Sequence, residues 1–357
     1  MIYLLPMQVN KWLWIIPALL AIVVAGFLII PKDGHEFEVD GIHYRIIDNI
    51  SNVVEVTCKG GDWEACDQEY SGAVVIPDSL TYRSRTYRVT EIDDHAFSGC
   101  DEMTSVSIPA SVWHIGLDAF SGCYGLKEIH ISDLSAWCEM SFWDVLDETG
   151  DSPFFYADGL YLNGELITDL VVPEDVEDFG AHSFEGYDKL RSVVFQKDID
   201  AIYKSAFYGC SSLTSVTFEG DVGYIGPYTF DGTPWLENQP DGEIYIDKLL
   251  YKYKGEMPFN TSIVVKEGTE YICQSAFDCC EGLTSITLPS SLKQIHDYAF
   301  NGCVNLKEIY CKALTPPSIN SYYNNFHDDV AIYVPKGTRE AYREESPLFD
   351  NAVEIDF

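Results

Sequence analysis

The sequence contains few basic residues. Its 357 residues include 22 Lys and Arg against 57 Asp and Glu, which gives a formal net charge of -35. The acidic residues are spread along the chain, so the surface is expected to be negative throughout and to repel phosphate backbones and anionic membranes. We therefore exclude nucleic-acid binding. The ordinary reason for such a charge is a well-solvated surface, and the functional alternative is a basic partner.

Motifs of catalysis and of cofactor binding are also absent. The sequence has no H-E-x-x-H, no G-x-S-x-G, no Walker or G-x-G-x-x-G phosphate-binding loop and no EF-hand loop. Its cysteines and histidines form no pair at the spacing that a zinc site requires. These absences predict that the chain is not an enzyme and needs neither a cofactor nor a metal ion.

Only one long apolar run is present, at the N-terminus. Residues 12–30, "WLWIIPALLAIVVAGFLII", carry no charge, and as a helix they would span about 28 Å, close to the thickness of a bilayer core. Lys11 precedes the run and acidic residues follow it. The positive-inside rule therefore leaves residues 1–11 in the cytoplasm and the rest of the chain outside.

We expect this run to be an uncleaved signal anchor, joined to the folded chain by a short linker over residues 31–36. The alternative is a secretory signal peptide, because Val23-Val24-Ala25 offers small residues near an acceptable cleavage site. Cleavage there would release a secreted protein. The apolar run continues beyond that point, which favours the membrane anchor.

A ten-residue pattern recurs through the rest of the chain. "EIDDHAFSGC", residues 91–100, returns as "HIGLDAFSGC", residues 114–123. Each copy has an apolar residue five positions before its phenylalanine, and the commonest spacing between copies is 23 residues. A fixed period of this length is typical of a solenoid. The repeated phenylalanines are Phe97, Phe120, Phe184, Phe207, Phe230, Phe277 and Phe300.

A second pattern, L-x-x-I-x-I, follows each copy and repeats with the same period. Examples are "LRSVVF", "LTSVTF" and "LTSITLP". Alternation with period two predicts a short strand, and strands that recur every 23 residues stack in a parallel sheet about 4.8 Å apart. The predicted fold class is a mainly β repeat solenoid with short helices and turns.

The two patterns together resemble the BspA-like leucine-rich repeat family of bacterial surface proteins, of the type found in Bacteroidales. The combined phrase is L-x-x-I-x-I-P followed by V-x-x-I-G-x-x-A-F-x-G-C, and the resemblance covers residues from about 37 to 357. It implies a curved solenoid used for binding, often as an adhesin, with no catalytic activity of its own.

The remaining segments are expected to close or interrupt the solenoid. Residues 37–90 contain strand-like segments and are predicted to form an N-terminal β cap and the first rung, and residues 91–315 the repeats. Two interruptions break the period: residues 132–165, predicted to be a degenerate rung with an aromatic-rich protrusion, and residues 236–262, predicted to form a hairpin that turns at Asp247-Lys248. Residues 316–357 are expected to form a C-terminal cap with a last strand and a short helix.

Eleven cysteines in an exported chain would normally indicate disulfides. Five of them recur three residues after the phenylalanine, and a nucleophile has no reason to recur with the rungs. We expect buried thiols at these positions: Cys100, Cys123, Cys210, Cys280 and Cys303. Cys279 beside Cys280 is expected to be a separate thiol. Cys58 and Cys66 lie outside the series, and they form either a loop disulfide or two unpaired thiols.

Several of the eight histidines stand at variable positions of the turn before the phenylalanine, among them His95, His182 and His296. At such positions a solvated side chain is the expected role.

If the chain is a solenoid, the outward side chains of its strands form an extended surface. In L-x-x-I-x-I these are the third and fifth positions. A plain solvated sheet face rich in Ser and Thr would have the same composition. The candidate binding residues are Ser105, Ser107, Glu128, His130, Ser192, Val194, Ser215, Thr217, Ser285, Thr287, Glu308 and Tyr310.

The function that this sequence favours is protein binding outside the cytoplasm, as an adhesin or host-contact factor whose ligand is a host or envelope protein. The alternative is a periplasmic scaffold whose partner belongs to its own cell envelope. A third, less favoured hypothesis is an enzyme with its site in one of the interruptions. Its candidate carboxylates are Asp144, Asp147, Glu148 and Asp151, and they have no identifiable partner group.

Overall fold

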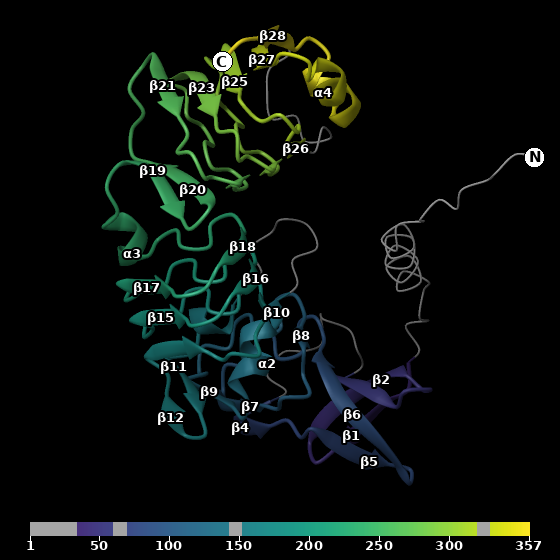
Figure 1. Cartoon of the computed structure of the whole chain (residues 1–357). Helices are drawn as coiled ribbons and strands as arrows, with labels where there is room; N and C mark the ends of the chain where they lie inside the picture. The colour runs from purple at the N-terminus through teal and green to yellow at the C-terminus, as the bar shows by residue number, and fades with distance from the viewer. Residues whose placement is uncertain (1–33, 60–69, 143–151, 320–328) are drawn as a thin grey trace, which may run out of the picture.

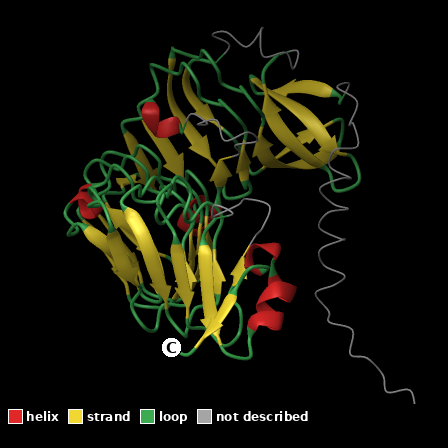
Figure 2. Cartoon of the chain, turned by 90° about the horizontal axis from the view of Figure 1, so that it is seen from above, coloured by secondary structure: helices red, strands yellow, loops and turns green. Residues whose placement is uncertain are grey.

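The computed structural model describes residues 34–59, 70–142, 152–319 and 329–357. They form a solenoid in which most turns contribute two short strands on opposite sides of a common core (Figure 1). Helices are few and short, and most of the described chain is strand and loop (Figure 2). No helix within these ranges is long and apolar enough to cross a membrane. The predicted anchor, residues 12–30, lies outside the described residues.

The L-x-x-I-x-I segments form the expected strands, and the sheets that they build are called here the outer sheets. Neighbouring strands pair in parallel one period apart, as Ser192 does with Ser215. Three outer sheets have the orders β12-β11-β9-β7-β4, β13-β15-β17 and β21-β23-β25-β27-β28. Their strands are β4 (Gly72–Val75), β7 (Met103–Ile108), β9 (Glu128–Ile131), β11 (Gly159–Leu162), β12 (Glu165–Leu166), β13 (Asp169–Val172), β15 (Ser192–Phe195), β17 (Ser215–Phe218), β21 (Thr261–Val264), β23 (Leu283–Leu288), β25 (Glu308–Cys311), β27 (Ala331–Pro335) and β28 (Val353–Ile355).

A second set of parallel strands, called here the inner sheets, was not predicted. Many of these strands have only two residues, too few for an alternating pattern to be visible in the sequence. The inner strands are β6 (Arg85–Ile92), β8 (His114–Ile115), β10 (Ser141–Phe142), β14 (Asp178–Phe179), β16 (Ile199–Ile202), β18 (Val222–Ile225), β20 (Leu249–Lys254), β22 (Tyr271–Ile272), β24 (Gln294–Ile295) and β26 (Ser318–Ile319). Seven of these ten end at the apolar residue five positions before a repeated phenylalanine, and β6 and β20 lie in the cap and hairpin segments where strands were expected.

The repeated phenylalanines form the stacked core that the period predicts. All seven are buried, and those of consecutive rungs lie face to face. The ring centroids of Phe97 and Phe120 are 5.2 Å apart, and those of Phe207 and Phe230 are 5.6 Å apart with an interplanar angle of 1°. Stacked rings of this size contribute much of the apolar area that a single rung cannot bury alone.

The turn around each phenylalanine uses two left-handed residues. The residue two before it has a positive φ in all seven copies, from 51° at Asp118 to 60° at Tyr228, although none of them is glycine. The residue two after it is also left-handed. It is glycine in six copies and Cys279 in the seventh, where φ is 56°. Glycine tolerates this conformation without strain.

The N-terminal cap contains the expected strands, β1 (Glu36–Val39), β2 (Ile42–Asp48), β3 (Val53–Thr57) and β5 (Ser79–Tyr82). Through β3, which pairs with β6, the cap covers the first edge of the inner sheets. Among the residues that the structure describes, the cap adds no strand to the outer sheets, where β4 is the last strand of its sheet.

At the other end the predicted strand and helix are present as β27 and α4 (Arg339–Glu345), followed by the 3-10 helix Pro347–Phe349. The chain then adds a strand that was not predicted. β28 pairs in parallel with β27 and ends the outer sheet.

The first interruption differs from its prediction. It contains α2 (Leu134–Glu139) and the 3-10 helix Pro153–Phe155. Trp137, Phe142 and Phe154 are buried, while Phe155 is exposed. The indole Nε1–H of Trp137 donates to the carbonyl of Ser183 at 3.1 Å. These three rings therefore fill the core beside the irregular rung, and residues 143–151, the rest of the predicted protrusion, lie outside the described residues.

The second interruption is the predicted hairpin. The short helix α3 (Pro234–Glu237) precedes it, and β19 (Gly242–Ile246) pairs antiparallel with β20 through a turn at Asp247-Lys248. The solenoid bends here, toward the inner sheets (Figure 1). Tyr224 on β18 and His296 after β24 have β20 and β22 between them, a distance of about 14 Å in a flat sheet. Their ring centroids are 4.9 Å apart, which requires a sharp bend.

Candidate functional site

The candidate binding residues lie at outward positions of the outer sheets, half-exposed or exposed. The structure brings them together in three groups of four, on β7 and β9, on β15 and β17, and on β23 and β25. It does not join the groups into one sheet, because pairing stops between β12 and β13 and between β17 and β21. Within each group, third positions align with third positions and fifth with fifth.

The first group extends into an aromatic cluster on β9 and β11. A ring nitrogen of His130, Nε2, lies 3.0 Å from a carboxylate oxygen of Glu128. The ring of Tyr161 on β11 stacks on the ring of His130, with the two ring centroids 5.2 Å apart. Sequence reasoning missed Tyr161 because it stands in the irregular rung. The signal was available, since "GLYL" fits the same strand pattern.

The third group ends in a similar cluster on β25 and β27. The rings of Tyr310 and Tyr333 stack with centroids 4.7 Å apart, and the hydroxyl of Tyr310 donates to the carboxylate of Glu308 at 3.2 Å. Tyr333 was missed because its strand belongs to the C-terminal cap. Both clusters thus combine a carboxylate at the third position with stacked aromatic rings at the fifth.

The fifth position also carries exposed valines where the aromatic rings are absent. Val75, Val171 and Val264 expose 64%, 50% and 69% of their surface. Third positions between the clusters are polar, and Ser192 there donates to the carboxylate of Asp169 at 2.8 Å. The outer sheets therefore present a fifth-position row that is mostly apolar or aromatic, interrupted by Ser107, Thr217 and Thr287, beside a polar row.

The inner side of the bend contains a further cluster of rings, which sequence reasoning missed. Tyr203 lies 6.4 Å from Tyr224, and Tyr271 lies 6.4 Å from His296, between ring centroids. The Nε2 atom of His296 is buried and has no hydrogen-bond partner in the described part of the chain. Burial lowers the pKa of His296 and raises that of Tyr224 to about 12. These rings contact one another and so contribute to the bend itself.

The recurring cysteines are buried, as predicted, and have a role that was not predicted. The thiols of Cys123, Cys210 and Cys303 donate to the carbonyl oxygens of Phe97, Phe184 and Phe277 in the preceding rung, at 3.0, 3.0 and 3.1 Å. Burial raises the pKa of Cys123 and of Cys303 to about 12. Such thiols stay protonated and do not act as nucleophiles.

The other cysteines divide into one bridged residue and several thiols. Cys58 is disulfide-bonded, and Cys66, its predicted partner, lies outside the described residues, so that pairing stays a prediction. Cys279 and Cys280 form no bridge, as expected, and Cys279 is the exposed thiol among the described cysteines.

The expectation of solvated turn histidines was wrong for His182. Its side chain is buried and its Nδ1 hydrogen-bonds the carboxylate of Glu185, which is buried as well. A buried polar group needs a partner, and Glu185, three residues further along the chain, supplies one. His296 is also half-buried rather than solvated.

The described ranges contain no group of three or more His, Cys, Asp or Glu side chains arranged to hold a metal ion. Asp144, Asp147, Glu148 and Asp151, the carboxylates of the enzyme hypothesis, lie outside those ranges.

Comparison with known families identifies the repeat. The model of the BspA type leucine rich repeat region matches residues 78–145, 158–239 and 251–333, with six copies. These segments cover more than half of the chain. The chain belongs to the BspA-type leucine-rich repeat family.

Solved structures of bacterial leucine-rich repeat proteins resemble this BspA-type chain at low identity. A leucine-rich cell surface protein from Faecalibacterium prausnitzii is 19% identical, with 87% of this chain and 97% of that one covered and a TM-score of 0.34. A leucine-rich repeat protein from Bacteroides ovatus is 19% identical, with 85% and 100% covered and a TM-score of 0.25. The pneumococcal vaccine antigen PcpA is 13% identical, with 91% and 99% covered and a TM-score of 0.29. No curated protein matches the sequence.

Membership in this family places the chain among extracytoplasmic surface proteins whose repeats serve protein-protein interaction. The BspA-type solenoid is typically not an enzyme.

Proposed function

We propose that the chain is a membrane-anchored extracytoplasmic protein that binds another protein through its outer sheets, as an adhesin or host-contact factor. The observation that carries this proposal is the row of fifth-position side chains, most of them apolar or aromatic, beside a row made mainly of hydroxyls and carboxylates. Protein interfaces combine an apolar, aromatic centre with a polar rim in the same way.

The cluster of Glu128, His130 and Tyr161 is the favoured centre of the interface. Stacking holds Tyr161 against His130, and the contact with Glu128 holds the imidazole. Rings that are already fixed lose little conformational entropy on binding. The net charge of -35 favours a partner with a basic surface.

The apolar run over residues 12–30 supports the membrane anchor, and the acidic chain that follows it supports an extracytoplasmic location. A secreted form after signal cleavage remains the alternative, and N-terminal sequencing of the mature protein distinguishes the two.

Affinity capture tests the binding face. The full-length chain in mild detergent is immobilised and exposed to extracts of host matrix and of cell envelope. The double variant His130→Ala/Tyr161→Ala should weaken capture of the retained protein at least about 10-fold, since buried aromatic contacts each contribute more than 1 kcal/mol. The control Ser192→Ala/Ser215→Ala changes the hydroxyl-rich middle group and should retain the partner. Capture by neither extract, or equal capture by the first double variant, would contradict the proposal.

The periplasmic scaffold is distinguished by labelling intact cells. A membrane-impermeant maleimide should react with the exposed thiol of Cys279 if the chain faces the exterior, and a Cys279→Ser variant supplies the background. Labelling only after the outer envelope is opened would favour the scaffold.

A further inference from the structure

The first strand of the outer sheets has an open edge. The N–H groups of Gly72 and Ile76 donate to the carbonyls of Glu102 and Ser107, on the β7 side. Because backbone groups alternate along a strand, those of Ala73 and Val75 point to the other side of β4. In the described part of the chain no strand pairs with that side. Such an edge is a template for one more strand.

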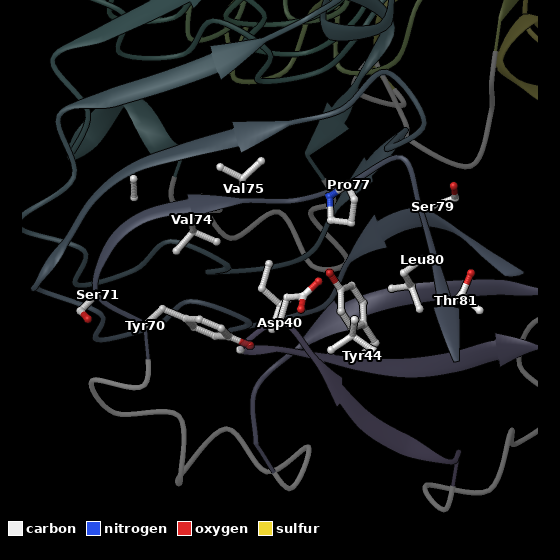
Figure 3. Close-up of a pocket in the computed structure, with 14 residues that line it drawn as sticks. Asp40, Tyr44, Tyr70, Ser71, Val74, Val75, Pro77, Ser79, Leu80 and Thr81 are labelled. Carbon is white, nitrogen blue, oxygen red and sulfur yellow. The ribbon is translucent and has the colours of Figure 1, made fainter. Parts of the chain in front are cut away.

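This open edge faces a groove of about 760 Å³ between β4 and the N-terminal cap (Figure 3). One wall is β4 itself, from Ser71 to Pro77. The other is the turn between β1 and β2 together with Leu80 of β5. The groove is thus long, bordered by backbone on one side and lined by both apolar and polar groups. These are the features of a site that takes an extended peptide by strand addition.

The hydroxyl of Tyr44 supports a ligand in this groove. Tyr44 is 1% exposed and lines the groove, and its hydroxyl forms no hydrogen bond with any described residue. Its neighbour Tyr70 is different, because its hydroxyl donates to the carbonyl of Thr57 at 2.7 Å and accepts from the N–H of His43 at 3.1 Å. Tyr70 is therefore part of the cap, whereas the hydroxyl of Tyr44 lines the groove with no protein partner and is available to a ligand.

The charge of the groove indicates the kind of peptide. Asp40 is the one residue with a formal charge among the described lining residues. It lies close enough to Tyr44 to raise the pKa of that phenol, in addition to the larger effect of burial. The rest of the chain is strongly acidic, so a cationic side chain is favoured beside Asp40. The same net charge opposes the approach of a second copy.

We propose that the groove binds an extended, lysine- or arginine-containing peptide segment of a partner protein, which adds to β4 as a further strand and places its cationic side chain beside Asp40. β4 has four residues and spans about 13 Å, so the segment contacts it over four or five residues. This site is separate from the face of the proposed function, and either can fail without the other.

A defined peptide tests the proposal. The probe is fluorescently labelled Thr-Val-Lys-Val-Thr with blocked ends, added to the full-length chain in mild detergent. Two control peptides carry Glu in place of Lys, or N-methyl groups on both Val amides. The lysine peptide should bind at least about 10-fold more tightly than either control, and should slow hydrogen exchange of the Ala73 and Val75 amides. Equal binding of the N-methylated peptide, or no binding of the lysine peptide, would overturn strand addition.

Three variants locate the site. Val75→Pro removes the outward N–H of β4 and leaves the β7 ladder intact, so it should abolish binding. Val171→Pro makes the same change on β13, another sheet-ending strand, and should bind normally. Tyr44→Phe should bind about 3- to 10-fold more weakly with an unchanged melting temperature, because its hydroxyl has no partner to lose in the unliganded protein. Normal binding by Val75→Pro would refute the proposal, and so would a dimer of the unliganded chain that Val75→Pro converts to a monomer.

Discussion

At the scale of single residues, the repeat is set by a turn that needs two left-handed positions in every copy. The second of these is glycine in six copies, and neighbouring turns stack so closely that a Cβ on Gly302 would lie 3.0 Å from the Cα of Cys279. Cys279 alone carries a Cβ at this position. It is exposed and forms no disulfide, and its thiol donates a long hydrogen bond, 3.7 Å, to the exposed carboxylate of Asp278, which offsets little of the backbone strain.

Cys279→Gly should therefore stabilise the chain by roughly 0.5 to 1 kcal/mol. The left-handed conformation costs an L-residue about 1 to 2 kcal/mol, and the greater flexibility of unfolded glycine offsets part of that gain. Urea denaturation measures the difference. Cys279→Ala keeps a Cβ and should change stability by less than about 0.5 kcal/mol. A loss of stability with glycine would show that the thiol makes a contact that matters.

The sequence predicts residues whose role follows from the period, and fails where the role depends on geometry between rungs. Burial of Phe207 and Cys210 could be predicted because both recur in register. The hydrogen bond from Cys210 to Phe184 could not, because it depends on how far one rung is shifted over the next. His182 looked solvated because polar residues in turns usually are, whereas its ring is buried beside the carboxylate of Glu185.

At the scale of elements, the stack of phenylalanines is the main source of cohesion between rungs. Phe207→Ala should cost about 3 to 5 kcal/mol, as expected for a fully buried phenylalanine whose removal leaves a cavity. Its ring lies between Phe184 and Phe230, at 5.8 and 5.6 Å. Tyr208→Ala removes the exposed neighbouring ring and should change the free energy of unfolding by less than about 0.5 kcal/mol. A cost below 1 kcal/mol for Phe207→Ala would show that the stack contributes little.

The position of the bend is an element-scale property that could not be predicted from the sequence. The hairpin at Asp247-Lys248 was recognisable from its alternating pattern, but its effect on the stack depends on contacts between distant rungs. Tyr224 provides these contacts, through His296 and through a hydrogen bond from its hydroxyl to Oε1 of Gln274 at 3.4 Å.

Tyr224→Ala should open the bend and leave the strands intact. Small-angle scattering should show a larger maximum dimension, with an unchanged circular dichroism spectrum. Tyr208→Ala, also on the surface but outside the bend, is the control. Identical scattering curves for Tyr224→Ala and the unmodified chain would show that the hairpin alone sets the curvature.

At the scale of the whole molecule, the buried thiols make the solenoid sensitive to alkali. Burial raises the pKa of Cys123, Cys273, Cys280 and Cys303 from 9.0 to about 12. Above pH 9 these thiols lose their protons in the unfolded chain and keep them in the folded chain. Their contribution to the free energy of unfolding is therefore fully present below pH 9 and is lost as the pH rises toward 12. Over this range each thiol lowers the free energy of unfolding by up to about 1.4 kcal/mol per pH unit.

The urea midpoint should therefore decrease steadily between pH 9 and pH 10.5 at constant ionic strength. A midpoint that stays constant over this range would contradict the burial of the thiols.

The architecture as a whole was predictable because two independent patterns repeat with one period, while the binding face was predictable only in outline. Outward positions follow from strand alternation, which places Glu128 and His130 on the surface. Tyr161 completes one aromatic cluster from an irregular rung, where the period does not apply. Tyr333 completes the other from one period after Tyr310, on a strand that was assigned to the cap.

The most direct test of the central claim, that the outer sheets bind a protein partner, is hydrogen exchange of the full-length chain with and without the partner captured from the extracts. We predict slower exchange of the backbone amides in β9 and β11, around His130 and Tyr161, with little change in β16, β18 and β24 of the inner sheets. Protection confined to the inner sheets, or no protection of the outer strands at saturating partner, would contradict it.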